Sequence, residues 1–377
     1  MRLESPLASS GTVASARALA PSIAARAAAA DRGDATLAPD IDDLHAAGLL
    51  RAPLSAGTGG VGLCWQAGSV ADGVDVLRLL GRANLAVARL FEGHVNAVKL
   101  VMLLGAPRVQ ARIARAVRAG ALMGVWGADG ARPVHLRPDG IRFRLEGAKR
   151  FTSGLGLVSL AVLSVTDADG AVQLVVAPAH DAGRADPTTW QVSGMRATAS
   201  GDFDASGLML GPDALLGGPG DYHREPHFLG GVWRYAAAQL GGLEALVEAL
   251  RTDLAARGRL SDPHQAARFA RSAMACETAR LWVRKAALTV EAPDADPDTA
   301  TRAVLARLIV ERAASETMTE VGRALGAAAH FTDHPVERLR RDLGFYLCQA
   351  APDQALHAAA VALAARADPV GDFWTAP

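Results

Sequence analysis

The sequence predicts an α+β protein that is mostly α, with an N-terminal helical domain, a middle β-barrel-like domain and a C-terminal four-helix bundle. Apolar residues recur every three or four positions from residue 13 to about 120, which is the period of a helix. From about 121 to 215 they alternate with polar residues between Gly and Asp turns, as in β-strands. Long helical patterns return after residue 233. The expected domains are residues 1–120, 121–220 and 221–377.

The N-terminal region has helical apolar spacing in two clear stretches: Ile41, Leu44 and Gly48, and Val95, Val98 and Met102. Its first residues are rich in Ala, Ser and Arg, which is also typical of a transit peptide. The spacing of Leu19, Ile23 and Ala27 is nevertheless that of an amphipathic helix. We therefore expect a folded helix here and a cytoplasmic protein.

Two segments of the middle region are typical of β-hairpins. One alternates around an Asp-Gly turn in RPVHLRPDGIRFRLEGAKRF, and the other is LAVLSVTDADGAVQLVVAP. A third strand pair is expected around GMRATASGDFDASGLML, where Gly and Asp again supply the turns. The middle domain is therefore expected to be built from hairpins.

The C-terminal region predicts four helices joined by short loops, over residues 233–257, 263–291, 297–329 and 336–365. Breaks in the pattern set these bounds, at Gly258, Pro263, Pro293 and Pro335. Long helices with short connections favour an antiparallel bundle. A β module between two helical regions offers a domain junction, which is a common place for a ligand site.

Charge and cysteine content exclude several classes of partner and site. Lys plus Arg and Asp plus Glu both number 39, and we find no basic patch for nucleic acid or an anionic membrane. Lysine is rare, since only Lys99, Lys149 and Lys285 are present, an imbalance that codon bias explains. Small molecules and other proteins remain as partners.

The three cysteines have no metal-ligand spacing, and we interpret them as reduced cytoplasmic thiols: Cys64, Cys276 and Cys348. No metal site is therefore expected. The longest apolar run, residues 155–165, is far shorter than a transmembrane helix requires and is strand-like.

Five segments, taken in order, resemble the acyl-CoA dehydrogenase superfamily over nearly the whole chain: GLLRAPLSAGTGGVG, GVWG, LEGAKRFTSG, VSGMRATASGDFDASGLML and PVERLRRDLGFYL. The resemblance implies FAD bound between the β domain and the bundle, and oxidation of the CH–CH bond of an acyl thioester or similar small molecule. It also implies a homodimer or homotetramer, because the family completes its FAD site with residues of a second subunit, and an electron-acceptor flavoprotein as a further partner.

The resemblance assigns the flavin ring to two segments, which are Val125, Trp126, Gly127 and Ala128, and Phe151, Thr152 and Ser153. A flat ring with polar edges needs backbone N–H and C=O groups along a strand edge and hydroxyls near its N5 atom. The alternative is that Trp126 and Phe151 are core aromatics and that Thr152 only fills a strand.

The rest of the dinucleotide is assigned to the bundle, with Arg257, Arg259 and Gln265 at the pyrophosphate and Glu320, Gly322 and Gly326 at the adenine end. Phosphates need positive charge or helix N-termini. The alternatives are solvated arginines and small residues that let helices pack closely. In ERLRRD, the pairs Glu337–Arg341 and Arg338–Asp342 are spaced by four residues and favour a structural role.

The carboxylate base of family dehydrogenases is missing from both of its usual places. Counting from the RD pair ends on Ala350 or, with a slip of one residue, on Gln349, and neither can take a proton. The other usual place, on the first bundle helix, holds Gly231 or Arg234. The nearest carboxylates in sequence are Glu244, about two turns too late, and Asp353.

Two alternatives to dehydrogenation therefore stay open. One is a flavin monooxygenase on the same scaffold, although those relatives commonly carry a His where this chain has Gln349. The other is a catalytically degenerate FAD-binding or scaffold subunit. Further polar groups for a cleft are His94, Asn96, His223 and His227, although a lone His on a helix is more often a satisfied core or surface residue.

Overall fold

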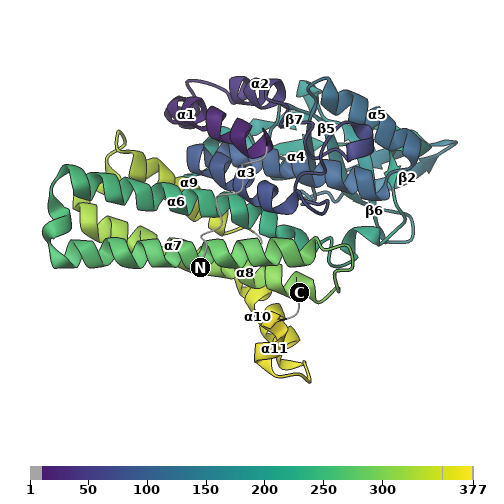
Figure 1. The fold of residues 1–377 in the computed structure, drawn as a ribbon. Helices are drawn as coiled ribbons and strands as arrows, with labels where there is room; N and C mark the ends of the chain where they lie inside the picture. Colours follow the sequence, from purple (N-terminus) through teal and green to yellow (C-terminus); the bar gives the residue numbers. More distant parts are fainter. Residues whose placement is uncertain (1–10, 350, 376–377) are drawn as a thin grey trace.

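The computed structural model describes residues 11–349 and 351–375, and it has the expected α+β architecture (Figure 1). The N-terminal part is helical, with α1 (Gly11–Arg32), α2 (Ala38–Ala46), α3 (Val70–Ala83), α4 (Leu85–Leu104) and α5 (Pro107–Arg118). Ile23 and Ala27 of α1 are buried, which confirms the amphipathic helix expected there. The first ten residues of the expected N-terminal domain lie outside the described part.

The middle of the chain contains the strands β1 (Leu122–Trp126), β2 (His135–Asp139), β3 (Arg142–Glu146), β4 (Ala148–Lys149), β5 (Val158–Thr166), β6 (Val172–Pro178), β7 (Ala185–Asp186), β8 (Asp202–Asp204), β9 (Met209–Leu210) and β10 (Leu215–Leu216). One mixed sheet has the order β10-β6-β5-β2-β3-β9, with β1 paired in parallel to β5. A smaller sheet has the order β4-β8-β7.

Two of the three expected hairpins are confirmed. Strands β2 and β3 pair across the Asp-Gly turn, and β5 pairs with β6 over seven residues of each strand. The prediction of the third hairpin is wrong, because β8 pairs with β4 and β7 whereas β9 pairs with β3. Met195 and Ala199 have positive φ angles of 57° and 45° on either side of a 3-10 turn, so the chain there cannot run as a continuous strand.

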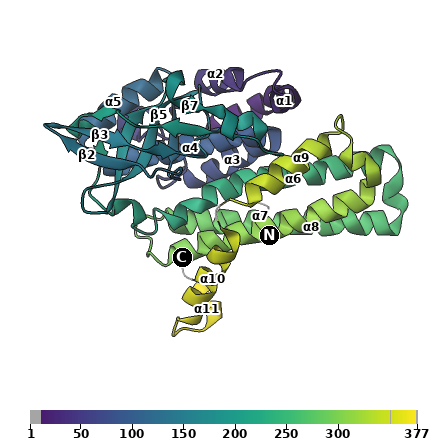
Figure 2. The same ribbon diagram turned by 180° about the vertical axis from the view of Figure 1, so that it is seen from behind.

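The C-terminal part forms the bundle from α6 (Trp233–Ala256), α7 (Pro263–Val290), α8 (Thr299–Leu325) and α9 (Pro335–Leu347), followed by α10 (Pro352–Ala364) and α11 (Val370–Thr375). Figures 1 and 2 show α6, α7 and α8 as long neighbouring rods, with α10 and α11 projecting away from them. The prediction of one continuous fourth helix over residues 336–365 is wrong. Pro352 begins a new helix, and Ala351 before it has a positive φ of 49°.

Glycine lets α3 and α6 touch backbone to backbone. A Cβ atom at Gly81 would lie 2.1 Å from the carbonyl oxygen of Ala238, and one at Gly241 would lie 2.2 Å from that of Arg78. No side chain fits in either place, so the N-terminal helices are in direct contact with the bundle.

Both charged pairs of ERLRRD form within α9, which confirms their structural role. Arg341 pairs with Glu337 at 2.5 Å and Arg338 with Asp342 at 3.4 Å. Asp342 also accepts a hydrogen bond of 2.7 Å from the backbone N–H of Met195. This bond fixes the left-handed residue that begins the 3-10 turn.

Asp31 joins three parts of the fold, because its buried carboxylate at the end of α1 accepts hydrogen bonds from Arg196 and Arg341. Burial raises the pKa of Asp31, but the two guanidinium groups outweigh it and lower the pKa to about 2.

We expect Asp31→Asn to lower the free energy of unfolding by about 2 kcal/mol at pH 7, since the carboxylate has a pKa near 4 when unfolded. A depressed pKa stabilises the fold above pH 4, and that stability is lost as the pH falls towards 2. Urea denaturation at pH 7 and at lower pH should therefore show the two proteins converging in acid. A constant difference between them would contradict this role.

Candidate active site

A cavity of about 670 Å³ lies where the large sheet meets α4, α6 and α9. It is lined from α4 and β1, from the segments 150–153 and 190–198, from the loop before α6, and from α6 and the end of α9. The expected ring residues Val125, Trp126, Gly127, Phe151 and Ser153 all line it, and so does Ala128. The structure therefore gathers two segments that are about 25 residues apart in sequence.

Strand β1 presents a backbone edge to this cavity. Among the described strands it pairs only with β5, and the N–H of Met123 points away from β5, donating to His94 Nδ1 at 3.0 Å. Backbone groups alternate along a strand, so the N–H and C=O of Val125 point to that same edge. Val125 lines the cavity, which gives it the strand-edge donor and acceptor that a flat polar ligand requires.

Lys149 fixes the backbone where β1 ends. Its fully buried ammonium group donates to the carbonyl oxygen of Gly127 at 3.1 Å and pairs with Asp129 at 2.6 Å. Ser164 of β5 donates to the same carbonyl at 3.0 Å. The hydrogen bonds from Lys149 and Ser164 therefore fix the backbone conformation of the residues at the cavity wall.

Aromatic rings form a second wall. Phe151 has 52% of its surface exposed and a positive φ of 55°, so the alternative that it is a core aromatic is wrong. The Phe151 ring meets Trp190 edge-on at 6.2 Å, and Trp190 meets Phe345 at 5.4 Å. Trp126 is different, because it is only 2% exposed and packs on Phe203.

The two hydroxyl residues after Phe151 lie in different places. Thr152 is buried and does not line the cavity, since its hydroxyl donates to the carbonyl oxygen of Gly201 at 2.9 Å. Ser153 lines the cavity, with its Oγ 3.2 Å from Ser200 Oγ, and Ser200 lies 2.8 Å from Thr198. Ser153 is thus the hydroxyl offered to a ligand, and Thr152 holds the backbone behind it.

Helix α4 supplies a polar wall, of which the sequence interpretation named Asn96 and missed Glu92. Glu92 is buried and lines the cavity, where Arg89 pairs with it at 2.6 Å and the amide of Asn96 donates to its other oxygen. Tyr346 also lines the cavity, and its buried hydroxyl has no hydrogen-bond partner within the described residues. Burial raises the pKa of Tyr346 well above its ordinary value, so this hydroxyl stays a neutral donor.

Neither usual base position brings a carboxylate to the cavity. Gln349, Gly231 and Arg234 line it, whereas Ala350 lies outside the described residues. Glu244 does not line it and instead pairs with Arg78 at 2.8 Å.

Asp353 is exposed in the first turn of α10 and does not line the cavity either. Glu92 is the carboxylate that does, counting the described residues alone.

The histidines divide between core and cavity. His94 is fully buried, with Nδ1 accepting from Met123 and Nε2 donating to the carbonyl oxygen of Leu50 at 2.7 Å, and burial lowers its pKa to about 4. It is a satisfied core residue. His227 lines the cavity, and burial lowers its pKa, so it is neutral there. The His223 ring meets Phe228 edge-on, with the ring centres 4.8 Å apart.

The residues expected at the FAD phosphates and adenine do not line this cavity. They gather at the far end of the bundle, where the turn from α6 to α7 meets the end of α8: Arg257, Arg259, Gln265, Glu320, Gly322 and Gly326. Glu320 accepts from Arg271 at 3.0 Å, Arg257 pairs with Asp253 at 2.9 Å, and Arg259 is exposed. Their assignment to the phosphates and adenine of a flavin stays a prediction.

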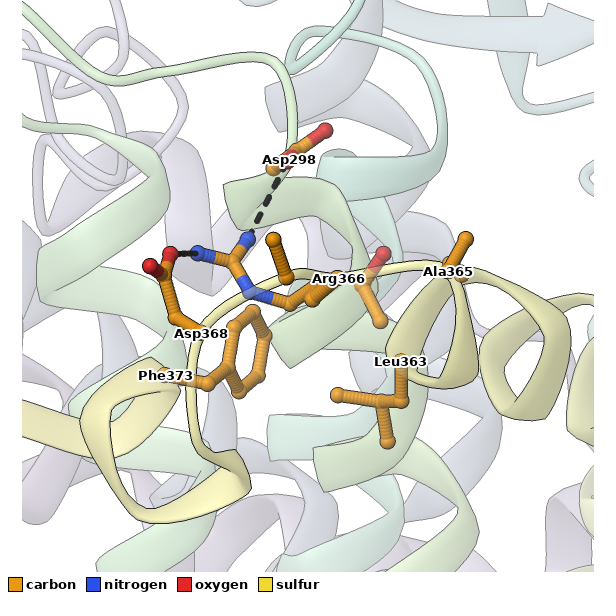
Figure 3. Close-up of a pocket in the computed structure, with 9 residues that line it drawn as sticks. Asp298, Leu363, Ala365, Arg366, Asp368 and Phe373 are labelled. Carbon is orange, nitrogen blue, oxygen red and sulfur yellow. Dashed lines mark hydrogen bonds and ion pairs between the residues drawn. The ribbon is translucent and has the colours of Figure 1, made fainter.

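A second pocket of about 390 Å³ lies between α8 and the C-terminal helices (Figure 3). Arg366 bridges Asp298 at 3.2 Å and Asp368 at 3.3 Å, and its guanidinium lies 5.2 Å from the centre of the Phe373 ring. None of the expected flavin residues lines this pocket. Its charged groups already pair with one another, so the pocket is a place where the segment after α10 is attached to the start of α8.

Within residues 11–349 and 351–375, no group of three or more His, Cys, Asp or Glu side chains is arranged to hold a metal ion. No helix there combines the length and apolar character needed to cross a bilayer.

Comparison with known proteins shows which family the C-terminal part of the chain matches. Residues 231–347 match the family model of the acyl-CoA dehydrogenase C-terminal domain. The fold is that of butyryl-CoA dehydrogenase from Megasphaera elsdenii, with a TM-score of 0.85 and 16% identity over 97% of this chain and 100% of that one. Residues 231–347 thus match an acyl-CoA dehydrogenase domain, and the described chain has the acyl-CoA dehydrogenase fold.

Other relatives are monooxygenases. Dibenzothiophene monooxygenase from Rhodococcus erythropolis is 28% identical over 222 residues, which are 55% of this chain and 51% of that protein. The chain thus spans about half the length of the curated relatives it matches. FMN-bound TdsC from Paenibacillus sp. A11-2 has a TM-score of 0.82 and 20% identity, with 93% of this chain and 96% of that one covered.

Proposed function

We propose that this protein is a flavin-dependent monooxygenase of a small molecule. The observation that carries the proposal is the cavity itself: residues at both usual base positions line it and none of them is a carboxylate. The one lining carboxylate among the described residues, Glu92, stands at neither usual base position and is held by Arg89 and Asn96. The similarity to dibenzothiophene monooxygenases supports the same function.

The residues present fit a flavin ring. The edge of β1 at Val125 offers a backbone donor and acceptor, Trp190 and Phe345 offer an aromatic face, and Ser153 offers a hydroxyl. When bound and reduced, a flavin reacts with O₂ and delivers one oxygen atom to an organic substrate, while the other leaves as water. The FMN-bound TdsC supports FMN as the cofactor to test beside the FAD that the family resemblance implies.

The chain's own residues would bind and orient the reactants. Trp190, Phe151 and Phe345 exclude water from one side of the cavity. Tyr346 holds an unpaired hydroxyl donor inside the cavity, and Gln349 adds an amide at its rim. Such fixed donors stabilise developing negative charge on oxygen.

The test supplies purified protein with FMN or FAD, a separate flavin reductase, NADH and air, and measures oxygenated product by mass spectrometry with ¹⁸O₂. Indole and dibenzothiophene are the first substrates. We expect one labelled oxygen atom per product molecule with at least one of them. A parallel sample receives acyl-CoA thioesters without oxygen, and bleaching of its flavin band would instead establish dehydrogenation and overturn the proposal.

We also propose that the protein is a homodimer or homotetramer. The residues expected at the phosphates and adenine lie at the other end of the bundle and do not line the same subunit's cavity, which supports a role at a second subunit. Sedimentation equilibrium of the flavin-loaded protein measures this, and a monomer would contradict it.

A further inference from the structure

Two cations share one carboxylate at the α4 and α6 wall of the cavity. Lys99 donates to both oxygens of Glu291 at 2.9 and 2.7 Å, and Arg234 pairs with Oε1 of the same group. Trp233 donates to that oxygen at 3.1 Å. Lys99, Arg234 and Glu291 are 4%, 1% and 8% exposed, so the cluster has one uncompensated positive charge out of contact with bulk water.

The uncompensated charge faces the cavity. Lys99 and Arg234 line it, whereas Glu291 lies behind them and does not. His227 lines the same region but is neutral, because burial lowers its pKa. The nearby pair of Arg89 and Glu92 is balanced and adds no net charge.

Both cations also have a donor to spare. An ammonium group has three N–H bonds, and Lys99 uses two of them on Glu291. Nε of Arg234 is buried and has no hydrogen-bond partner among the described residues. An unpaired buried charge is costly, so a ligand that compensates it stabilises the protein.

We propose that Lys99 and Arg234 form a subsite for an anionic oxygen group, a carboxylate or its equivalent, on the substrate of this cavity. This inference rests on the proposed function, since it names the class of substrate taken by the same site. A monoanion neutralises the cluster and accepts from the free N–H of Lys99. Burial and the neighbouring Arg234 lower the pKa of Lys99 to about 8, and a bound anion favours its charged form.

The phosphate of a flavin has the same chemistry, but the geometry favours the substrate. The strand edge and aromatic rings that suit the flavin ring belong to β1 and to segments 150–153 and 190–198, whereas the cations belong to α4 and α6. The cations therefore lie on other elements of the cavity wall than the ring residues, which favours contact with a second molecule.

The experiment compares benzoate with benzamide, which has nearly the same shape and no charge. Binding to the protein loaded with oxidised FMN is measured by calorimetry and by the shift of the flavin band, without reductant. We expect benzoate to bind about tenfold more tightly than benzamide, as a charge-assisted contact requires. Equal affinities in the wild-type protein overturn the proposal, and this comparison needs no variant.

Variants then locate the preference. Lys99→Met should remove it and Lys99→Arg should keep most of it, while Lys285→Met, the matched loss of an exposed lysine on α7, should leave it unchanged. A preference that survives in a folded Lys99→Met protein overturns the assignment.

Competition separates the two sources of anion. If benzoate and inorganic phosphate bind only the flavin-free protein and displace FMN, the cluster serves the flavin phosphate and the substrate subsite is overturned. If benzoate binds together with FMN, the subsite stands. Because no turnover is needed, this result holds even if the ¹⁸O₂ assay fails, so the two proposals fail separately.

Discussion

Glu291→Gln is expected to lower the free energy of unfolding by about 3–5 kcal/mol, the largest effect of any single substitution considered. The change keeps the shape of the side chain and removes its charge, which leaves Lys99 and Arg234 as two buried, mutually repelling cations. Arg234 and Lys99 hold the pKa of Glu291 below its ordinary value, although burial alone would raise it, so this residue is ionised at neutral pH. Urea denaturation at pH 7 measures the loss.

Glu277→Gln is the matched control. Glu277 lies on α7, the helix that Glu291 follows, and it pairs with Arg280, but its side chain is 54% exposed. An exposed pair contributes at most about 1 kcal/mol, so this variant should be close to the wild type.

Adding Lys99→Met to Glu291→Gln removes one of the two stranded cations and should recover part of the loss. Equal losses in Glu291→Gln and Glu277→Gln would mean that water reaches the cluster.

Gly194→Ala is expected to destabilise the protein by about 1–3 kcal/mol and to lower the flavin content of the purified protein. A Cβ atom there would lie 2.0 Å from the carbonyl oxygen of Arg341, so the segment or α9 must move. The next residue, Met195, lines the cavity and donates to Asp342, which means that the movement reaches the cavity wall directly.

The control for this variant is Gly211→Ala. Gly211 has a φ of −82°, which any residue adopts, and nothing lies within 4 Å of an added Cβ atom. Its stability and flavin-to-protein ratio should equal those of the wild type. Full flavin content in Gly194→Ala would show that the 193–198 segment does not shape the site.

Local sequence signals predicted most of the fold. The Asp-Gly turn at Asp139 fixed the register of β2 and β3, and Pro263 and Pro335 begin α7 and α9 as expected. The fourth helix was predicted too long because the Ala-rich sequence beyond Gln349 has high helix propensity, which hid the effect of Pro352. High helix propensity therefore extended the predicted fourth helix past Pro352, where the structure begins a new helix.

The site was predicted only on its β side. Val125, Phe151 and Ser153 lie in short segments whose order resembles the family, and the structure brings them together. The assignment of the whole set to a flavin is still a prediction.

The charged wall was missed because Lys99 lies on a helix that is mostly apolar, and its partner Glu291 is 192 residues away in sequence. The available signal was the rarity of lysine itself, since three lysines in 377 residues make one within an apolar helix unusual.

The glycine contact between α3 and α6 has a consequence for how the cavity changes shape. Helices that meet backbone to backbone at Gly81 and Gly241 have no side chains between them to re-pack, so they cannot slide past each other. Because α4 follows α3 directly after Asn84, the two helices α4 and α6 that line the cavity behave as one rigid unit. Adjustment of the cavity to ligands of different size must therefore come from the short loop segments around Phe151 and Met195.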